Sequence, residues 1–351
     1  MSGEGMEANS SNSTAEGQVK DQAISVLTTT IYIVMGLLGV VGNTLVLVVI
    51  IVVRDLHDVA NVLIGNQSLI DLLTSLLLLA SFVAPLPSIP TNNPILARFL
   101  CAFWHSKYPF WSLIVASSLN LTLMTLERYY AIVFPLHYHS RTKSTKLACL
   151  VALPWLSGFA YQQNLMWFSQ MDNDSCNLFQ FPNNETRTGF AFGAMFLELV
   201  LPIAVMAFVY TSLTRKLRST MEEKFNKRTK ENPRLTSESK TRKAGRVDHR
   251  RTARRNIIKV MLTVSLFFII CWTPNQVLYM AFCFGYNLNF NGFLYTFSVF
   301  IAFGNMWINP FIYSFQYRRF QKGLRKVFCR WRKEKRSNKP MAVSNTLSAT
   351  L

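Results

Sequence analysis

The chain has 351 residues, of which 50% are hydrophobic and only 16% are charged. Soluble globular proteins carry about a quarter charged residues, so this composition argues against a soluble fold. The formal net charge of +19 would suit a nucleic-acid-binding protein. The basic residues are clustered, however, with 17 between Arg215 and Lys259 and 11 between Arg318 and Lys339. We therefore expect no nucleic acid as a partner and consider membrane-spanning segments first.

Seven apolar stretches have the length of a membrane span. A helix needs ~20 residues to cross a ~30 Å hydrocarbon core, and each stretch approaches or exceeds that length. Lipid offers no hydrogen-bond partners to the backbone, so a helix is the expected form of each. The sequence predicts an all-α membrane protein, a seven-transmembrane helix bundle. The stretches cover residues 26–53, 60–86, 102–133, 147–168, 188–213, 256–284 and 290–315.

Charge sets the expected orientation, because Lys and Arg in short loops mark the cytoplasmic face. An extracellular N-terminus places 33 of the 37 basic residues on the cytoplasmic side. The sequence thus predicts a multi-pass plasma-membrane protein with an extracellular N-terminus and a cytoplasmic C-terminus. Anionic membrane lipid is an expected partner of the basic loop and tail.

The expected domain limits follow from the same pattern. Residues 1–25 are polar and predict a disordered, glycosylated extracellular tail, followed by a seven-helix domain over residues 26–316 with a basic cytoplasmic loop at about 217–252. Residues 317–330 combine apolar residues at helical spacing with basic ones, which predicts a short amphipathic helix on the membrane surface. Residues 331–351 form the cytoplasmic tail. Candidate glycosylation acceptors on the external side are Asn9, Asn12, Asn173 and Asn184.

Three cysteines have predicted roles. Cys101 and Cys176 fall on the side expected to be oxidising, and a disulfide between them would hold the second outer loop over the bundle. Cys329 ends the amphipathic segment and is a candidate palmitoylation site, with a free cytosolic thiol as the alternative.

Nearly every apolar stretch carries one distinctive polar or helix-breaking mark, and an ionisable group within a span is a functional candidate. The marks, in order, are Gly42-Asn43-Thr44, Asp71, Ser117 with Asn120 and Glu127-Arg128-Tyr129, Trp155, Pro202 with Tyr210, Phe268 with Cys271-Trp272-Thr273-Pro274, and Asn305 with Asn309-Pro310-Phe311-Ile312-Tyr313. With these landmarks, the chain resembles a rhodopsin-like (class A) G-protein-coupled receptor over about residues 26–330, and neuropeptide receptors most closely.

The resemblance implies a receptor, not an enzyme. An extracellular ligand would drive an outward swing of the sixth helix, which opens a site for a heterotrimeric G protein. Pro274 breaks that helix and supplies a pivot. Arrestin and receptor kinases are further implied partners, with candidate phosphorylation sites at 236–239 and 344–349. The implied activation relay is Phe268, Trp272, Pro274, Asn309 and Pro310.

The family's switch is expected at the inner end of the third span. There Glu127 would pair with Arg128 at rest and release it on activation. Many relatives add an acid at the inner end of the sixth helix, where this chain has Arg254. We therefore predict a lightly held resting state with appreciable basal signalling. The predicted coupling set is Glu127, Arg128, Tyr129, Leu136, Tyr210, Arg254 and Tyr313.

Asp71 is the deepest lone acid of the predicted spans. A charge at mid-membrane costs about 3 kcal/mol or more, so the carboxyl must be paired or neutral. The resemblance implies an allosteric sodium ion, although Met306 replaces a serine found in many members. A protonated, hydrogen-bonded aspartic acid is the alternative, and no other cofactor is expected. The candidate sodium ligands are Asp71, Ser117, Asn305 and Asn309.

The ligand pocket is expected one to three turns above Trp272. Phe303 replaces the retinal-binding lysine of opsins and Phe110 replaces the aspartate of amine receptors, which argues against both subfamilies. Glu198 either pairs within the bundle or awaits a basic ligand group. The predicted pocket residues are Lys107, Phe110, Trp111, Ile114, Glu198, Asn275, Gln276, Tyr279, Tyr295 and Val299.

We therefore predict a short peptide ligand with a basic or amidated end. The alternatives are a non-peptide ligand for the same family and, from another class, a transporter or channel. Transporters commonly contain repeated halves, and no internal repeat is visible in the sequence. The 27 positions from Cys101 to Arg128 exceed the family's usual spacing by two, which predicts a bulge near Pro109.

Overall fold

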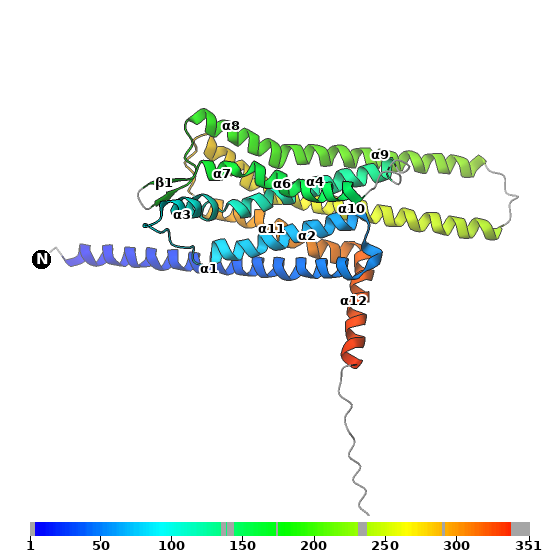
Figure 1. Ribbon diagram of the computed structural model, residues 1–351, viewed down its shortest axis with the longest axis horizontal. Helices are drawn as coiled ribbons and strands as arrows, with labels where there is room; N and C mark the ends of the chain where they lie inside the picture. Colours follow the sequence, from blue (N-terminus) through cyan, green and yellow to red (C-terminus); the bar gives the residue numbers. More distant parts are fainter. Residues whose placement is uncertain are drawn as a thin grey trace, which may run out of the picture.

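Seven long helices run side by side in a computed structural model of the protein (Figure 1). They are α1 (Glu4–Val52), α2 (Val59–Leu78), α4 (Tyr108–Val133), α6 (Ser144–Tyr161), α9 (Leu201–Lys230), α10 (Ser237–Cys283) and α11 (Phe293–Gln316). Side chains are described at residues 22, 25–134, 138, 146–172, 175–216, 256, 258–289 and 292–329.

Shorter elements extend or connect these helices. Three π-helical stretches lie within the bundle, and two short strands pair antiparallel with Met171 opposite Cys176. The hairpin was not predicted and is an addition to the expected all-α fold. The elements are η1 (Arg54–Leu56), η2 (Leu79–Val83), α3 (Pro94–Phe99), η3 (Leu100–His105), α7 (Gln163–Trp167), β1 (Gln170–Asp172), β2 (Ser175–Asn177), α8 (Asn184–Ala194), η4 (Met195–Val200) and α12 (Arg318–Ser337).

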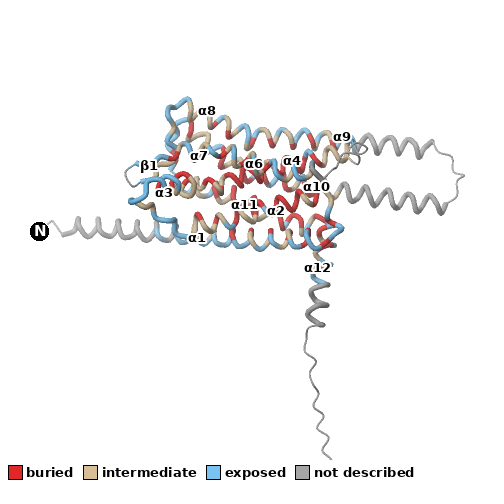
Figure 2. Tube along the Cα trace, in the orientation of Figure 1, coloured by how far each residue is buried: buried red, intermediate tan, exposed pale blue. Residues whose placement is uncertain are grey.

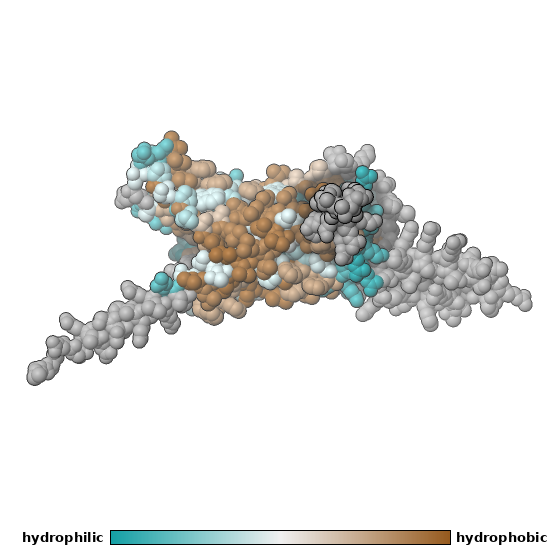
Figure 3. Space-filling view, turned by 90° about the horizontal axis from the view of Figure 1, so that it is seen from below, coloured by the Kyte–Doolittle hydropathy of each residue, from teal (hydrophilic) through white to brown (hydrophobic). Residues whose placement is uncertain are grey.

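The two ends of the bundle differ, and we name them by their elements. The hairpin end carries α3 and the two strands, and the α12 end carries α12, which lies crosswise to the long helices and leads away from the bundle (Figure 1). Buried residues concentrate where the helices face one another (Figure 2). On the face seen in Figure 3, hydrophobic side chains cover the middle of the bundle, with hydrophilic groups towards both ends. This surface suits a bundle surrounded by lipid.

Within the described part of the chain, five helical segments are long and apolar enough to cross a membrane. The remaining two predicted spans correspond to α6, which is short, and α11, which carries Asn305 and Asn309 in its interior. Both belong to the bundle, because α6 packs against α4 and α11 packs between α1 and α10. The predicted seven-helix architecture is confirmed. The five segments are Ser25–Val52, Val59–Val83, Pro94–Val133, Asn184–Lys216 and Ile258–Cys283.

Two helix ends differ from the expected domain limits. α1 begins at Glu4, within the tail predicted to be disordered, although its apolar part begins at Ser25. α12 begins at Arg318 and continues to Ser337, beyond the expected end at residue 330. Extending a formed helix requires less free energy than nucleating a new one, which accounts for both extensions. The domain limits themselves remain predictions.

Close helix packing depends on glycine at two positions. A Cβ at Gly158 of α6 would lie 2.4 Å from the carbonyl oxygen of Ser112 in α4. A Cβ at Gly42 of α1 would lie 3.0 Å from Pro310 of α11. An alanine at Gly158 would therefore force α6 away from α4, because the obstacle is backbone, whereas at Gly42 a small shift of Pro310 would be required.

Candidate functional site

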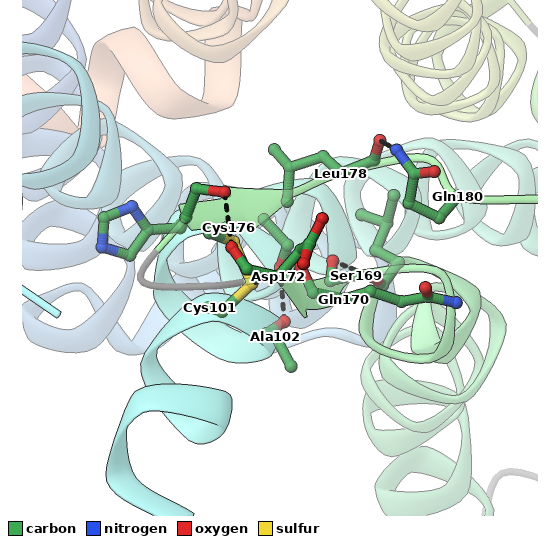
Figure 4. The surroundings of a disulfide bond; sticks show 12 residues. Cys101, Ala102, Ser169, Gln170, Asp172, Cys176, Leu178 and Gln180 are labelled. Carbon is green, nitrogen blue, oxygen red and sulfur yellow. Dashed lines mark hydrogen bonds between the residues drawn. A yellow bond between two sulfur atoms is a disulfide. The ribbon is translucent and has the colours of Figure 1, made fainter. Parts of the chain in front are cut away.

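A disulfide ties the hairpin to the third span. Cys101, in η3, bonds to Cys176, in β2, with the two Cα atoms 5.5 Å apart. Figure 4 shows the strands lying beside the first turns of this span, with the sulfur atoms between them. The predicted bond is therefore present, and it holds the segment after the hairpin against the end of the bundle.

The third span is irregular near Pro109, within the stretch from Cys101 to Arg128 that is two positions longer than usual for the family. Its hairpin end is π-helical over Leu100–His105, and Lys107 then adopts a left-handed backbone conformation with φ 57°. The bulge predicted near Pro109 is thus confirmed. It redirects the Lys107 side chain, whose Nζ lies 3.6 Å from the centroid of the Phe82 ring. This contact is a cation–π interaction.

A cavity of about 900 Å³, including its open mouth, lies at the hairpin end. Trp272 is part of its lining, as expected for the floor of a ligand pocket. Aromatic side chains and amides predominate, with one carboxyl group. The lining residues are Trp111, Tyr161, Gln162, Asn164, Leu165, Phe179, Phe190, Ala194, Glu198, Trp272, Asn275, Gln276, Tyr279, Phe282, Leu288 and Tyr295.

Six of the ten predicted ligand residues line this cavity, and four do not. Phe110 is fully buried, with its ring centroid 5.0 Å from that of Phe303. Val299 is also buried in the helix core. Ile114 lines a separate small cavity beside Asp71, and Lys107 is turned towards Phe82. None of these four side chains is part of the lining of the larger cavity.

The cavity also includes residues that the sequence did not predict. They come from the end of α6, from α7, from the segment after the hairpin, where Phe179 has φ 60°, from α8, and from the end of α10 and the turn after it. The available signal was Cys176, three residues before Phe179. A loop fixed to the third span so close to Phe179 brings this residue over the bundle.

Glu198 lies in η4, four residues before Pro202. Proline has no amide hydrogen, so the Glu198 carbonyl lacks its usual helical donor, and the chain forms a π-helical stretch there. The Gln276 Nε2 donates to Glu198 Oε2 at 2.6 Å, and Gln162 Nε2 lies 3.5 Å from Oε1. No Lys, Arg or His of the described residues forms a salt bridge with Glu198. The carboxyl is therefore paired with amides but with no cation.

Asp71 is buried in a hydrogen-bonded cluster. Its Oδ1 accepts from Ser117 Oγ and Gln67 Nε2, each at 3.0 Å, and its Oδ2 accepts from Asn309 Nδ2 at 2.9 Å. Among the predicted sodium ligands, the Asn305 and Asn309 amide oxygens are buried without a partner. These oxygens would suit a cation or a water molecule. The N–H group that Asn309 turns towards Asp71 cannot serve as a ligand, and the sodium site remains a prediction.

The ion pair expected at the α12 end is present. Arg128 Nε donates to Glu127 Oε2, and its NH2 group donates to Oε1 at 2.7 Å. The two side chains are 14% and 5% exposed. Tyr138, which was not predicted, donates its hydroxyl to Glu127 Oε1 at 2.5 Å. Burial and this hydrogen bond raise the pKa of Tyr138, so its phenol remains a donor at physiological pH.

The other predicted coupling residues are more scattered. Tyr210 lies 3.1 Å from Ser265 of α10, measured between the hydroxyl oxygens. The Tyr129 ring packs against Phe208, and Tyr313 is buried beside Phe320. Leu136 and the Arg254 side chain lie outside the described residues.

The relay residues pack in the core. The Phe268 and Trp272 rings are 6.4 Å apart between centroids, and Pro274 follows within α10. Pro310 cannot bond the Met306 carbonyl one turn earlier, and Asn43 Nδ2 of α1 donates to that oxygen at 2.9 Å. The Asn43 mark of the sequence therefore compensates the break that Pro310 makes in α11.

A polar cluster, which we call the α10–α11 latch, joins the two helices at the α12 end. Asn256 Nδ2 donates to the Gln316 carbonyl at 2.7 Å, and Thr263 Oγ1 donates to Gln316 Oε1 at 2.9 Å. The Arg318 amide donates to Asn256 Oδ1 at 3.1 Å. Asn256 thus forms hydrogen bonds with backbone groups at the end of α11 and the start of α12.

α12 is attached to the turn between α1 and α2. Arg319 pairs with Asp58, Lys326 pairs with Asp55, and Tyr317 donates to Asn61 at 2.9 Å. The hydrogen bond and charge of Lys326 lower the pKa of Asp55. Of the modification sites, Cys329 and Asn184 are exposed, which their predicted acylation and glycosylation require. Asn9, Asn12 and Asn173 lie outside the described residues.

Comparison with known proteins agrees with this geometry. The profile of the family "7 transmembrane receptor (rhodopsin family)" matches residues 42–313. G-protein coupled receptor 54 of Oreochromis niloticus is 26% identical over 303 residues, covering 83% of this chain and 75% of the relative. Galanin receptor 2a of Danio rerio is 25% identical, covering 87% of this chain and 78% of the relative. The Allatostatin-A receptor of Bombyx mori is 23% identical, covering 89% of this chain and 82% of the relative.

The family match spans most of the bundle, and the predicted landmarks lie within it or at its edges. Members of this family are receptors in the plasma membrane and not enzymes. They receive an extracellular ligand and couple to G proteins. The chain belongs to the rhodopsin family of seven-transmembrane receptors.

Proposed function

We propose that this receptor is activated by a short extracellular peptide with a basic or amidated end. The carrying observation is Glu198, a carboxyl group on the cavity wall that two glutamine amides contact but no described cation pairs with. A basic ligand group entering the cavity would gain a charge-assisted hydrogen bond in low-dielectric surroundings. Relatives named for galanin and allatostatin support a peptide.

In the proposed orientation the hairpin end is extracellular and the α12 end is cytoplasmic. Three observations support it: the disulfide and the exposed acceptor Asn184 at the hairpin end, and the basic α12 at the other. Ligand contact with Trp272 would tilt α10 about Pro274, opening the α12 end to the G protein. Arrestin, receptor kinases and anionic lipid are further proposed partners on that side.

A peptide-library screen tests the ligand class. Cells expressing the full chain and a promiscuous G-protein reporter are exposed to peptides with free, amidated and basic termini, and in parallel to non-peptide compounds. We expect responses from peptides with a basic or amidated end, and none in cells that express the Arg128→Ala variant. Responses confined to non-peptide compounds would establish the alternative ligand class instead.

The Glu198→Gln variant is expected to lower the potency of a basic peptide agonist about 10- to 100-fold. The amide keeps the size of the side chain but removes the charge, and hydrogen bonds to charged groups contribute about 1.5–3 kcal/mol. Dose–response curves at equal surface expression give the measurement. Asn164→Ala, a neutral change in the same cavity lining, is the matched control. Unchanged agonist potency across the responding peptides would remove Glu198 from the binding site.

The Arg254→Glu variant is expected to lower ligand-free signalling several-fold at equal surface expression. An acid at this position could pair with Arg128 and hold the inner end of α10, whereas an arginine repels it. Arg254→Gln is the control, because it removes the positive charge without adding an acid. Unchanged or higher ligand-free nucleotide exchange in the Glu variant would contradict the proposed weak restraint.

A further inference from the structure

Gln67 is a buried amide on α2, one turn before Asp71, with no exposed surface. Its Nε2 lies 3.0 Å from Asp71 Oδ1 and 2.6 Å from Ser117 Oγ. The sequence marks did not include it. An uncharged side chain on the same helix therefore already supplies a donor to the deepest acid of the bundle.

The orientation of this amide is fixed by a chain of hydrogen bonds that starts at α6. The Trp155 indole, which can only donate, bonds to Asn66 Oδ1 at 2.9 Å. Asn66 Nδ2 then donates to Asn120 Oδ1 at 2.9 Å, and Asn120 Nδ2 donates to Gln67 Oε1 at 2.8 Å. The Leu63 carbonyl, an acceptor only, receives Asn120 Nδ2 at 3.1 Å.

This chain, the amide relay, has a single direction. Because indole N–H cannot accept and a carbonyl cannot donate, each amide must turn its oxygen towards Trp155 and its nitrogen towards Asp71. Gln67 cannot flip without placing its NH2 group against the Asn120 NH2 group. Its oxygen is therefore unable to face the ion site as long as Asn120 keeps its place.

The orientation matters because hard cations require oxygen ligands. Around Asp71, the amides of Gln67 and Asn309 both present N–H groups. The Ser117 hydroxyl donates to Asp71 and accepts from Gln67, so this oxygen is engaged on both sides. Water molecules can serve the remaining amide oxygens of Asn305 and Asn309.

We propose that the amide relay takes the place of a bound cation at Asp71, and that Gln67 makes this receptor insensitive to sodium. The carboxylate accepts three hydrogen bonds from the protein, which occupy three of its about four acceptor positions, so a cation would have to compete with these donors. Sodium would also leave the Gln67 N–H group without its acceptor in the core, at a further cost in free energy. The inference concerns the folded receptor and does not depend on the ligand class.

The test measures thermal unfolding of the purified full-length receptor in sodium chloride and in choline chloride at equal ionic strength. The wild type is expected to unfold at the same temperature in both salts. Gln67→Met keeps the size of the side chain but removes its donor, and we expect sodium to raise its unfolding temperature by about 2 °C or more. The double variant Gln67→Met/Asp71→Asn should lose that gain.

The Asn120→Ala variant tests the same proposal in a second way. It removes the donor to Gln67 Oε1, which frees the amide to turn its oxygen towards a cation. Sodium stabilisation of this variant is therefore also expected, without any change at Gln67. Sodium stabilisation of the wild type that Asp71→Asn abolishes would overturn the proposal. Insensitivity of both single variants to sodium would overturn it equally, because the relay would then not be what excludes the ion.

Discussion

Replacing Glu127 by glutamine is expected to raise ligand-free nucleotide exchange on the G protein about tenfold or more. Arg128 is 14% exposed and its partner Glu127 only 5%, so the variant leaves a largely buried guanidinium without its counter-charge. Breaking a buried ion pair in this way typically costs 3–5 kcal/mol. If about 1.4 kcal/mol of that favours the state in which Arg128 turns away, the active population rises tenfold. Purified membranes with equal amounts of receptor give the measurement.

A graded series separates this switch from general destabilisation. Tyr138→Phe removes only the hydroxyl donor to Glu127, so a smaller rise of about 2- to 5-fold is expected. Asp55→Asn breaks the exposed pair with Lys326, and such pairs contribute little, so ligand-free exchange should not change. Basal exchange that stays at the wild-type level in Glu127→Gln would show that the pair does not restrain the receptor.

The sequence predicted the pair because Glu127 and Arg128 are neighbours at the end of an apolar stretch. Their order along a helix brings the charges together without any information on distant contacts. Tyr138 could not be found in this way, since it lies 11 positions from Glu127 and their contact depends on tertiary packing. The same distinction holds for the α10–α11 latch, where Asn256 and Gln316 are separated by 60 positions.

The pocket was only partly predictable for a related reason. Helical periodicity identifies which residues share a face, and it placed Trp111, Glu198 and Gln276 on the cavity wall. The position of a residue along the helix axis, and therefore its distance from the cavity, also depends on local irregularities of the helix. The π-helical η3 and the left-handed Lys107 displaced the first turns of the third span, and the sequence indicated only that an irregularity existed. Phe179 required the disulfide geometry as well.

Proline breaks were the most informative marks, because their consequence is local and certain. Pro310 leaves the Met306 carbonyl without an amide donor, and a buried polar group must then find another partner. Asn43 is the side chain that supplies it. Two sequence motifs on different helices are thus halves of one interaction, although the sequence alone did not pair them.

Breaking the α10–α11 latch is expected to raise ligand-free signalling about 2- to 10-fold. Thr263→Val keeps the shape of the side chain and removes the hydroxyl that donates to Gln316 Oε1. Asn256→Ala removes the donor to the Gln316 carbonyl and the acceptor for Arg318. Each hydrogen bond contributes about 0.5–1.5 kcal/mol to the state that contains it. An outward swing of α10 must separate these groups, so their loss favours the swung state.

Thr211→Val is the matched control, because among the described residues this threonine hydroxyl bonds only to carbonyls of its own helix. It should leave basal exchange unchanged. If Thr263→Val and Asn256→Ala both behave like this control, the latch does not restrain α10.

The latch also bears on how the resting state is held, because Arg254 cannot provide the acidic clamp to the third span. Restraint of α10 would then come mainly from α11 and α12 on one side and from the masking of Arg128 on the other. Glu127→Gln combined with Thr263→Val should raise basal exchange by the product of their separate effects, since the two contacts share no residue.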